Sequence, residues 1–445
     1  MKVAVIGGGL GGLVAAHALV GAGFDAHVLE ANHPGGVVGT TTVDGFVREH
    51  AASSFLGGPA RGALALCKEL GVAVEKASPK AKKRYVYIDG KLRQLPRGPV
   101  DLVRSDLLTW RGKLALLREP LAARRGTEDE SVHDFAARRL GPEAARAIIA
   151  PFVTGIYAAD SHDISLEAGF PKLAALDAAG GILRGAAKQA AKAMLGVATG
   201  KKSAKTPGGM WAPVGGLGSF VNALVAKLGP RLKNNVRVTS LVPDEHAVLV
   251  DGERWDAVVL ATPAHEGADL VSETMPELAS RLRVFERAPV ALVYLGMPEA
   301  SVPRAKDGFG FLVAQGEDLR TLGVVFESTV WSNRAPAGQA LLRCILGGGR
   351  DPEVTKLSDA ELIDLAYRDI CHAFGTDAKP THTSVIRWQR GIAQYPVGHR
   401  DHVRAAVTAG RVHRIALAGA DYRGPGVNDL CADRDVLVAE LRTWS

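Results

Sequence analysis

Apolar residues gather in short runs separated by amphipathic stretches and glycine-rich turns, a pattern typical of a chain that alternates strands and helices. The first run, Lys2–Ile6, is rich in β-branched residues and predicts a strand buried on both faces. The stretch after Gly12 has helical spacing and ends near Gly21, and a second strand is predicted over Ala26–Leu29. We therefore predict an α/β fold whose parallel sheet begins at the second residue.

The same apolar pattern returns far along the chain. Buried strands are predicted at Ala257–Pro263, where the proline ends the strand, and at Arg414–Leu417. An apolar helical pattern, Leu430–Leu441, follows the second of these after a glycine turn. Three more strands are expected in a separate sheet, at Ala291–Leu295, Phe309–Val313 and Leu341–Leu346. The first sheet is thus expected to be assembled from the two chain ends and a middle segment.

A glycine signature links the first strand to its helix, with the sequence Gly7-Gly8-Gly9-Leu10-Gly11-Gly12. In a G-x-G-x-x-G motif the first glycine permits a tight turn, the second lets the backbone approach a pyrophosphate, and the third lets helix and strand pack closely. The amino terminus of the helix offers free N–H groups to phosphates. Glu30, at the end of the second strand, is suited to accept hydrogen bonds from ribose hydroxyls. Together these parts predict a dinucleotide site.

The glycines alone do not separate FAD from NAD, and three further features favour FAD. Gly35-Gly36 allows a second backbone approach to a diphosphate, and the buried strand near Pro263 adds a middle segment to the domain. At the far end, Ala418–Asp429 contains another glycine turn before a helix. A helix amino terminus aimed at the isoalloxazine ring would stabilise the negative charge of a reduced flavin.

Composition narrows the class of protein. The 445 residues are 47% hydrophobic and 23% charged with a net charge of +7, which fits a globular protein and excludes a disordered or disulfide-stapled chain. Four dispersed cysteines predict free thiols in a reducing compartment, and no apolar run reaches the length of a spanning helix. The histidines lack metal-ligand spacing, so no metal site is expected. With a strand starting at residue 2 in place of a signal peptide, a cytoplasmic location is expected.

Several segments make the comparison with a known family specific. They include V-L-E-A-N-H-P-G-G, K-K-R-Y-V-Y-I-D-G-K-L-R-Q-L-P, G-F-G-F-L-V, N-R-A-P-A-G, I-A-Q-Y-P-V-G-H and L-A-G-A-D-Y-R-G-P-G-V-N-D. Over nearly its whole length the chain resembles the FAD-dependent amine-oxidase and desaturase superfamily, and within it the protoporphyrinogen oxidase family. The resemblance implies an α/β fold with a Rossmann-type FAD-binding domain, a mixed-sheet substrate domain and an inserted helical, membrane-contacting domain.

The resemblance also implies an activity. It is the oxygen-dependent, six-electron oxidation of protoporphyrinogen IX to protoporphyrin IX, with hydride transfer to flavin N5 and release of hydrogen peroxide. The flavin carries the chemistry, so no dedicated catalytic side chain is expected.

Carried over position by position, the resemblance implies two sets of site residues. Those expected at the cofactor are Gly7, Gly8, Gly9, Leu10, Gly11, Gly12, Glu30, Ala31, Gly36, Val37, Ala51, Ala52, Ser53, Ser54, Val238, Ala420, Pro425, Gly426 and Val427. Those expected at the substrate are Arg84, for a propionate, Trp331, for a pyrrole ring, and Leu312 and Gly155, for the cavity wall. A guanidinium suits the first role because it pairs with a carboxylate through two charge-assisted hydrogen bonds.

Three departures from the family pattern are present. Ala51–Ser54 stands where the family often has G-P-N-S, Trp331 replaces a commoner phenylalanine, and Ala432-Asp433 replaces serine-glycine. Plain structural roles compete with the substrate roles: Arg84 lies among Lys80, Lys82 and Lys83 and could belong to a solvated face, and Trp331 could simply fill the core.

Positive charge is concentrated in two stretches. Residues 80–125 hold thirteen Lys or Arg against four acids, and residues 182–206 hold six with no acid. The segment 182–196 spaces its cations by four on a predicted helix, which suits an anionic bilayer surface. A solvated basic helix is the competing interpretation. Nucleic-acid binding is not expected, because no binding motif is present and few aromatic residues are interleaved.

We place the FAD-binding domain at 1–78, 231–288 and 406–445, the substrate-binding domain at 79–94, 207–230 and 289–405, and the helical insertion at 95–206. The alternatives to protoporphyrinogen oxidation are coproporphyrinogen III oxidation, an amine oxidase or desaturase, and a non-catalytic flavin-binding scaffold. The expected partners are a porphyrinogen, dioxygen and an anionic membrane surface on the inner face of the cytoplasmic membrane, with a homodimer left open.

Overall fold

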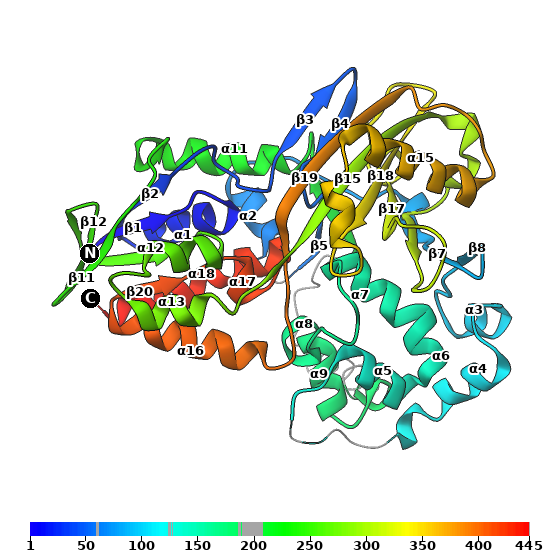
Figure 1. Ribbon diagram of the computed structural model, residues 1–445, viewed down its shortest axis with the longest axis horizontal. Helices are drawn as coiled ribbons and strands as arrows, with labels where there is room; N and C mark the ends of the chain where they lie inside the picture. The colour runs from blue at the N-terminus through cyan, green and yellow to red at the C-terminus, as the bar shows by residue number, and fades with distance from the viewer. Residues whose placement is uncertain (59–61, 123–125, 127, 186–187, 189–207, 445) are drawn as a thin grey trace, which may run out of the picture.

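The computed structural model of the chain describes residues 1–445 except 59–61, 123–125, 127, 186–187, 189–207 and 445. Most of the predicted basic helix 182–196 therefore lies outside the described residues. Figure 1 shows a body containing both termini on the left, a second sheet at the upper right and a group of helices at the lower right.

The left body is built on a five-stranded parallel sheet in the order β10-β2-β1-β14-β20. Its strands are β1 (Lys2–Ile6), β2 (Asp25–Glu30), β10 (Leu232–Asn234), β14 (Ala257–Leu260) and β20 (Ile415–Leu417). The predicted strands are confirmed here, and the two ends of the chain do share one sheet. A smaller antiparallel sheet, β11 (Leu241–Asp244), β12 (Ala247–Val250) and β13 (Glu253–Trp255), lies beside it.

Both faces of this sheet are covered by helices, as its continuous apolar strands require. Val3 and Val5 of β1 face a core cluster shared with α1 (Leu10–Gly21), α2 (Ala63–Glu69), α11 (Leu217–Leu228) and α18 (Val427–Arg442). Ala4 and Ile6 face the opposite cluster, shared with α12 (Ala264–Leu270), α13 (Pro276–Leu282) and α16 (His399–Val412). The alternation follows from the two-residue period of a strand.

The upper right body is a seven-stranded mixed sheet in the order β19-β15-β18-β17-β16-β7-β8. Its strands are β7 (Tyr85–Ile88), β8 (Lys91–Gln94), β15 (Arg287–Pro298), β16 (Gly310–Val313), β17 (Gly323–Phe326), β18 (Gln339–Gly347) and β19 (His382–Ala393). The three strands predicted for a separate sheet are β15, β16 and β18. Helix α15 (Asp359–Phe374) packs on one face of the sheet through Leu362 and Ile370.

The lower right body is helical, as predicted for the insertion (Figure 1). It contains α3 (Pro99–Arg104), α4 (Trp110–Leu117), α5 (Val132–Leu140), α6 (Pro142–Ala144), α7 (Ala150–Tyr157), α8 (Leu166–Gly169) and α9 (Pro171–Ala178). Arg139 and Asp177, both buried, form an ion pair of 2.5 Å between Nε and Oδ1 inside it. None of the helices in the described ranges is long and apolar enough to cross a membrane.

Two helices cross the predicted domain boundaries. Residues 207–230 are predicted to belong to the substrate domain, but Phe220 and Leu224 of α11, inside that range, lie in the core cluster that also contains Leu13 and Leu19 of α1. We therefore propose that α11 belongs to the body with the five-stranded sheet, while Met210 and Ala212 pack with Trp331. Helix α16 joins the same body from residue 399 and not from 406, since it packs against α13 and β20.

Candidate functional site

The glycine loop after β1 is closed so tightly that Gly7 and Gly12 cannot be replaced without displacing backbone. Gly7 has φ of 102°, and a Cβ atom at Gly12 would lie 2.0 Å from the carbonyl oxygen of Gly7. At Gly9, in contrast, an added Cβ would meet nothing within 4 Å. The loop is therefore packed on its inner side and open on the side where a bound group would lie.

The helix that begins here has free backbone donors. Helix α1 starts at Leu10 with Gly9 as its N-cap, and neither a capping side chain nor an acid in the first turn satisfies its N–H groups. Glu30, at the carboxyl end of β2, accepts hydrogen bonds from the N–H of Gly8 at 2.5 Å and of Asn32 at 2.7 Å. The loop thus combines unpaired donors for phosphates with a carboxylate placed for hydroxyl groups.

The carboxyl-terminal segment lies against this loop. A Cβ atom at Gly11 would come within 3.3 Å of Cα of Gly419, and Gly419 itself faces open space. Helix α17 (Ala420–Arg423) and the start of α18, with Pro425, Gly426 and Val427, follow directly. The structure therefore brings together the two glycine turns that the sequence places at opposite ends.

Hydrogen bonds hold the carboxyl-terminal turn in place. The Tyr395 hydroxyl donates to the carbonyl of Ala420 at 2.5 Å and accepts from the N–H of Gly424 at 2.6 Å. Asn428 bonds the carbonyl of Leu56 at 2.6 Å and the N–H of Ala63 at 2.9 Å. The tyrosine of the Q-Y-P-V-G-H segment thus has a clear role beside the expected cofactor.

The other expected cofactor residues border the same loop. Gly35 donates its N–H to the carbonyl of Gly8 at 2.7 Å, which places Gly36 and Val37 next to the motif. Ala31 follows Glu30 directly, and Val238 lies beyond β10, the strand that pairs with β2 at Glu30. These positions surround one elongated backbone surface, although the contacts with a cofactor stay predictions.

The segment Ala51–Ser54 joins the two sheets. Ala52 packs on the core cluster of the five-stranded sheet, and the buried Ser53 accepts a hydrogen bond from Arg343 of β18. Just before it, the buried Glu49 forms an ion pair of 2.9 Å with Arg334 and accepts a hydrogen bond of 2.6 Å from Thr40. Burial raises the pKa of Glu49, and Arg334 opposes that rise. Sequence reasoning missed Glu49, Arg334 and Arg343 as site residues, although Arg334 belongs to the N-R-A-P motif.

A cavity of about 560 Å³ lies beside Arg84. Its described lining includes four cations, Lys76, Lys82, Arg84 and Arg97, and no acid. Apolar lining comes from Ala77, Leu95, Ile148 and Met210. The Arg84 guanidinium lies 5.2 Å from the centre of the Phe309 ring, and no acidic partner for it exists in the described part of the chain. Its other described contact is with Sδ of Met210, at 3.5 Å from Nη2. An exposed guanidinium without an acidic partner among the described residues, at a cationic cavity, favours the predicted carboxylate role over a charge on a plain solvated face.

The remaining predicted substrate residues lie elsewhere. Gly155 of α7 and Leu312 of β16 touch, since a Cβ at Gly155 would be 2.6 Å from Cδ2 of Leu312, but neither lines the cavity at Arg84. Trp331 is only 1% exposed and packs in a core cluster with Ala81 and Ala212. This position fits the core-filling interpretation, and the substrate roles of these three residues stay predictions.

The glycine loop fits a dinucleotide cofactor such as FAD. Its open side, its unpaired helix N–H groups and Glu30 supply the contacts that a diphosphate and a ribose need, and the second glycine turn adjoins it at Gly419. Gly7–Gly12 would hold the diphosphate and Glu30 the ribose, with Pro425–Val427 at the isoalloxazine ring.

Comparison with known proteins agrees with this fit. The family model for flavin containing amine oxidoreductase matches residues 10–429. A chloroplastic protoporphyrinogen oxidase from Oryza sativa subsp. japonica is 29% identical, over 91% of this chain and 81% of the relative. A coproporphyrinogen III oxidase from Propionibacterium freudenreichii is 31% identical, over 96% and 88%.

The fold also has a close structural relative. A solved protein from Exiguobacterium sp. 255-15 superimposes with a TM-score of 0.83 at 22% identity, covering 99% of both chains. The chain therefore belongs to the flavin containing amine oxidoreductase family and is an FAD-dependent oxidoreductase.

Proposed function

We propose that this protein is an oxygen-dependent porphyrinogen oxidase whose substrate is protoporphyrinogen IX. The cavity at Arg84 carries this proposal, because its cations suit propionate groups while its apolar lining suits a macrocycle. A wall without acids speaks against an amine substrate, which would need negative or aromatic partners. The named relatives act on porphyrinogens, which supports the same substrate class.

The reaction balances as the loss of six electrons and six protons from the macrocycle, with three molecules of dioxygen reduced to hydrogen peroxide. Bound FAD supplies a two-electron acceptor that dioxygen reoxidises. The chain's own residues bind and orient: Arg84 and its neighbouring cations hold carboxylates, and the apolar lining excludes water from the ring. The purified protein should carry FAD and convert colourless protoporphyrinogen into fluorescent porphyrin with oxygen uptake. A bound flavin that no porphyrinogen reduces would refute the proposal.

Coproporphyrinogen III is the second candidate substrate. It carries four carboxylates where protoporphyrinogen carries two, and four cations line the cavity. The ratio of kcat/KM values on the two substrates decides between them. If the protein prefers coproporphyrinogen, and if neutralising Lys76 or Arg97 lowers that preference, these two cations bind the two additional carboxylates of coproporphyrinogen.

Replacing Arg84 with alanine is expected to raise KM about 10-fold while kcat changes less than about 3-fold, because docking of a carboxylate is mainly ground-state binding. Lys80→Ala is the matched control, since Lys80 is a neighbouring exposed cation that does not line the cavity. Steady-state oxygen uptake with protoporphyrinogen measures both constants. Equal KM values for the two variants would mean that Arg84 is only a charge on a solvated face.

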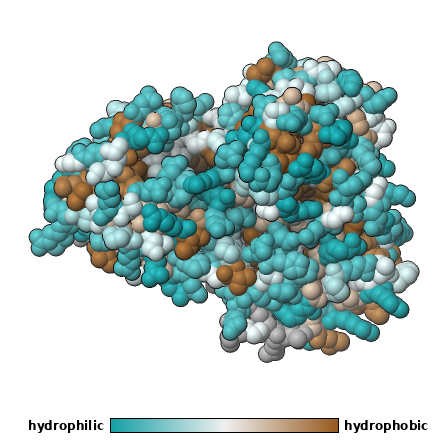
Figure 2. Space-filling view, viewed as in Figure 1, coloured by the Kyte–Doolittle hydropathy of each residue, from teal (hydrophilic) through white to brown (hydrophobic). Residues whose placement is uncertain are grey.

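We also propose an anionic membrane surface as a partner, docking at the helical insertion. Large apolar side chains are exposed on α3, α4 and the turn after α4, at Val100, Val103, Trp110, Leu114, Leu117 and Leu121. Exposed Arg104, Arg111 and Arg118 lie among them, and Lys113 lies 4.7 Å above the Trp110 ring. Figure 2 shows hydrophobic residues among hydrophilic ones at the lower right, where Figure 1 places α4. Aromatic and leucine side chains mixed with cations suit the interface of a bilayer.

The double substitution Trp110→Glu/Leu117→Glu is expected to lower binding to phosphatidylglycerol vesicles about 10-fold or more, since it removes apolar burial and adds negative charge. Val412→Glu is the control, because Val412 is as exposed as Leu117, at 75% against 74%, but lies on α16. Vesicle sedimentation at low salt measures the effect. Equal sedimentation of both variants would exclude this face as the docking surface.

A further inference from the structure

We propose that Arg343, supported by Glu327, is a positioning residue that fixes the Ala51–Ser54 segment through which the substrate-domain sheet holds the flavin. The inference rests on the proposed function, in which FAD is the bound cofactor, and on the expected contact of Ala51–Ser54 with it. It assigns a role to a buried ion pair that the reaction itself does not use.

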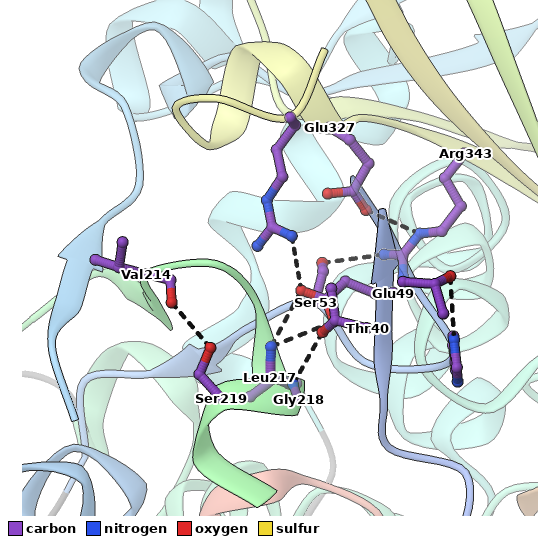
Figure 3. A network of polar contacts seen from close by, with 12 residues as sticks. Thr40, Glu49, Ser53, Val214, Leu217, Gly218, Ser219, Glu327 and Arg343 are labelled. Atoms are coloured by element: carbon purple, nitrogen blue, oxygen red, sulfur yellow. Dashed lines mark hydrogen bonds and ion pairs between the residues drawn. The ribbon is translucent and has the colours of Figure 1, made fainter. Parts of the chain in front are cut away.

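Arg343 reaches from the seven-stranded sheet to the segment with both ends of its guanidinium. Nη1 donates to the carbonyl oxygen of Ala51 at 2.6 Å, and Nη2 donates to Oγ of Ser53 at 3.1 Å. Nε lies 3.0 Å from Oε1 of Glu327, which follows β17 in α14 (Glu327–Val330). Figure 3 shows Arg343 between Glu327 and Ser53. Two hydrogen bonds from one planar guanidinium fix both the distance and the angle of the segment, and the ion pair with Glu327 balances the buried charge.

The two carbonyls that precede Ala51 are held in the same way. The Tyr294 hydroxyl donates to the carbonyl of Glu49 at 2.6 Å, and Trp388 Nε1 donates to the carbonyl of His50 at 2.7 Å. Three successive carbonyls, of residues 49, 50 and 51, thus accept side-chain donors from β15, β19 and β18, which are neighbours in one sheet. The sheet therefore holds this backbone as a rigid body.

The ion pair between Arg343 and Glu327 is deeply buried, and we infer that it orients the segment and does not add net stability. Arg343 is 6% exposed and Glu327 is 1% exposed. Removing two charges from water costs about as much as their attraction returns, so a buried pair is weak evidence for stabilisation. Charge-assisted hydrogen bonds in a buried site do hold their partners in one orientation. The Ser53 hydroxyl accepts one of these hydrogen bonds from Arg343.

The other side of the segment meets the cofactor domain. Ala52 packs on the core cluster that includes Leu10 of the glycine loop and Val427 at the start of α18. Displacement of the segment would therefore shift the residues around the expected FAD site. We expect both the affinity for FAD and the electronic environment of the flavin to depend on Arg343.

The experiment uses the charge-neutral double variant Arg343→Met/Glu327→Gln, which removes the anchor without leaving a lone buried charge. Apoprotein is titrated with FAD, and the flavin absorption spectrum and midpoint potential are recorded. We expect the Kd for FAD to rise about 10-fold or more, together with a shifted flavin spectrum or potential. The control is Arg139→Met/Asp177→Asn, an equally buried pair inside the helical insertion, which should leave the Kd, spectrum and potential unchanged.

Two milder variants decide the matter even if the double variant does not fold. Arg343→Lys keeps the charge but loses the planar fork, and Ser53→Ala removes one acceptor, so each should weaken FAD binding by about 3-fold. Wild-type Kd, spectrum and potential in both would overturn the proposal. Because the readouts need no porphyrinogen, they stand even if every porphyrinogen proves inactive, an outcome that would refute only the proposed substrate.

Discussion

Gly12→Ala is expected to abolish retention of FAD, because the new methyl carbon would lie 2.0 Å from the carbonyl oxygen of Gly7 and 3.1 Å from Cβ of Ala261. Helix α1 would have to move away from β1, and with it the N–H groups that are expected to face a diphosphate. Overpacking of this kind costs about 3 kcal/mol. We expect the Kd for FAD to rise more than about 100-fold, which is about 3 kcal/mol of binding. Flavin absorbance per protein and thermal unfolding measure the two effects.

Two controls, one in α1 and one at its N-cap, separate packing from cofactor contact. Gly21 ends α1 and an added Cβ there meets nothing within 4 Å, so Gly21→Ala should keep FAD and gain up to about 1 kcal/mol of stability. Gly9→Ala also meets no protein atom, and only a bound group would contact it, so it should lose FAD affinity without losing stability. Normal flavin content in Gly12→Ala would contradict the site.

The parallel sheet and its glycine loop could be predicted because their signals are local. The β-branched run at Lys2–Ile6 and the motif after it fix strand, turn and helix within a few residues, and the structure confirms the strand with the same bounds. The meeting of Gly11 with Gly419 could be predicted as well, since strand–glycine–helix units in one sheet direct their turns to the same edge.

The place of α11, within the predicted segment 207–230, could not be predicted from the sequence. Helix α11 has an apolar face with Phe220, Val221 and Leu224, but that face fits either sheet in composition. Two contacts decide where the helix packs. Glu49 accepts a hydrogen bond from the N–H of Leu217 at the start of the helix, and the apolar face of the helix packs on α1. Both are long-range contacts that a single sequence does not reveal.

The buried ion pairs were invisible for the same reason. Glu49, Glu327, Arg334 and Arg343 are spread over about three hundred residues, and charged side chains in a sequence predict exposure. Only folding shows that strands β15, β18 and β19 direct their side chains at one segment. Trp331 illustrates the converse, because the sequence allowed a substrate contact and the structure places its indole in the core.

Acidification is expected to destabilise the protein through His399, the histidine of the Q-Y-P-V-G-H segment. The imidazole is 2% exposed, stacks on Tyr395 at 4.0 Å and meets the Phe285 ring edge-on at 5.4 Å. Burial lowers the pKa of His399 to about 4, since the opposing effect of Asp421 is smaller and His402 adds to the lowering. The unfolded chain takes up a proton near pH 6.5, the ordinary value, while the folded chain does so only near pH 4.

The contribution is therefore fully present above pH 6.5 and is lost as the pH falls to about 4, by roughly 3 kcal/mol in all. Asp433 changes stability in the opposite direction over part of this range, because burial raises its pKa to about 6. The comparison that isolates His399 is with His399→Phe, which keeps a ring between Tyr395 and Phe285 and leaves Asp433 untouched. Urea unfolding at pH 7 and pH 4.5 should show that the wild type loses about 2 kcal/mol more than the variant. Equal losses in the two proteins would mean that His399 takes up its proton in the folded state as readily as in water, which its buried position between two aromatic rings argues against.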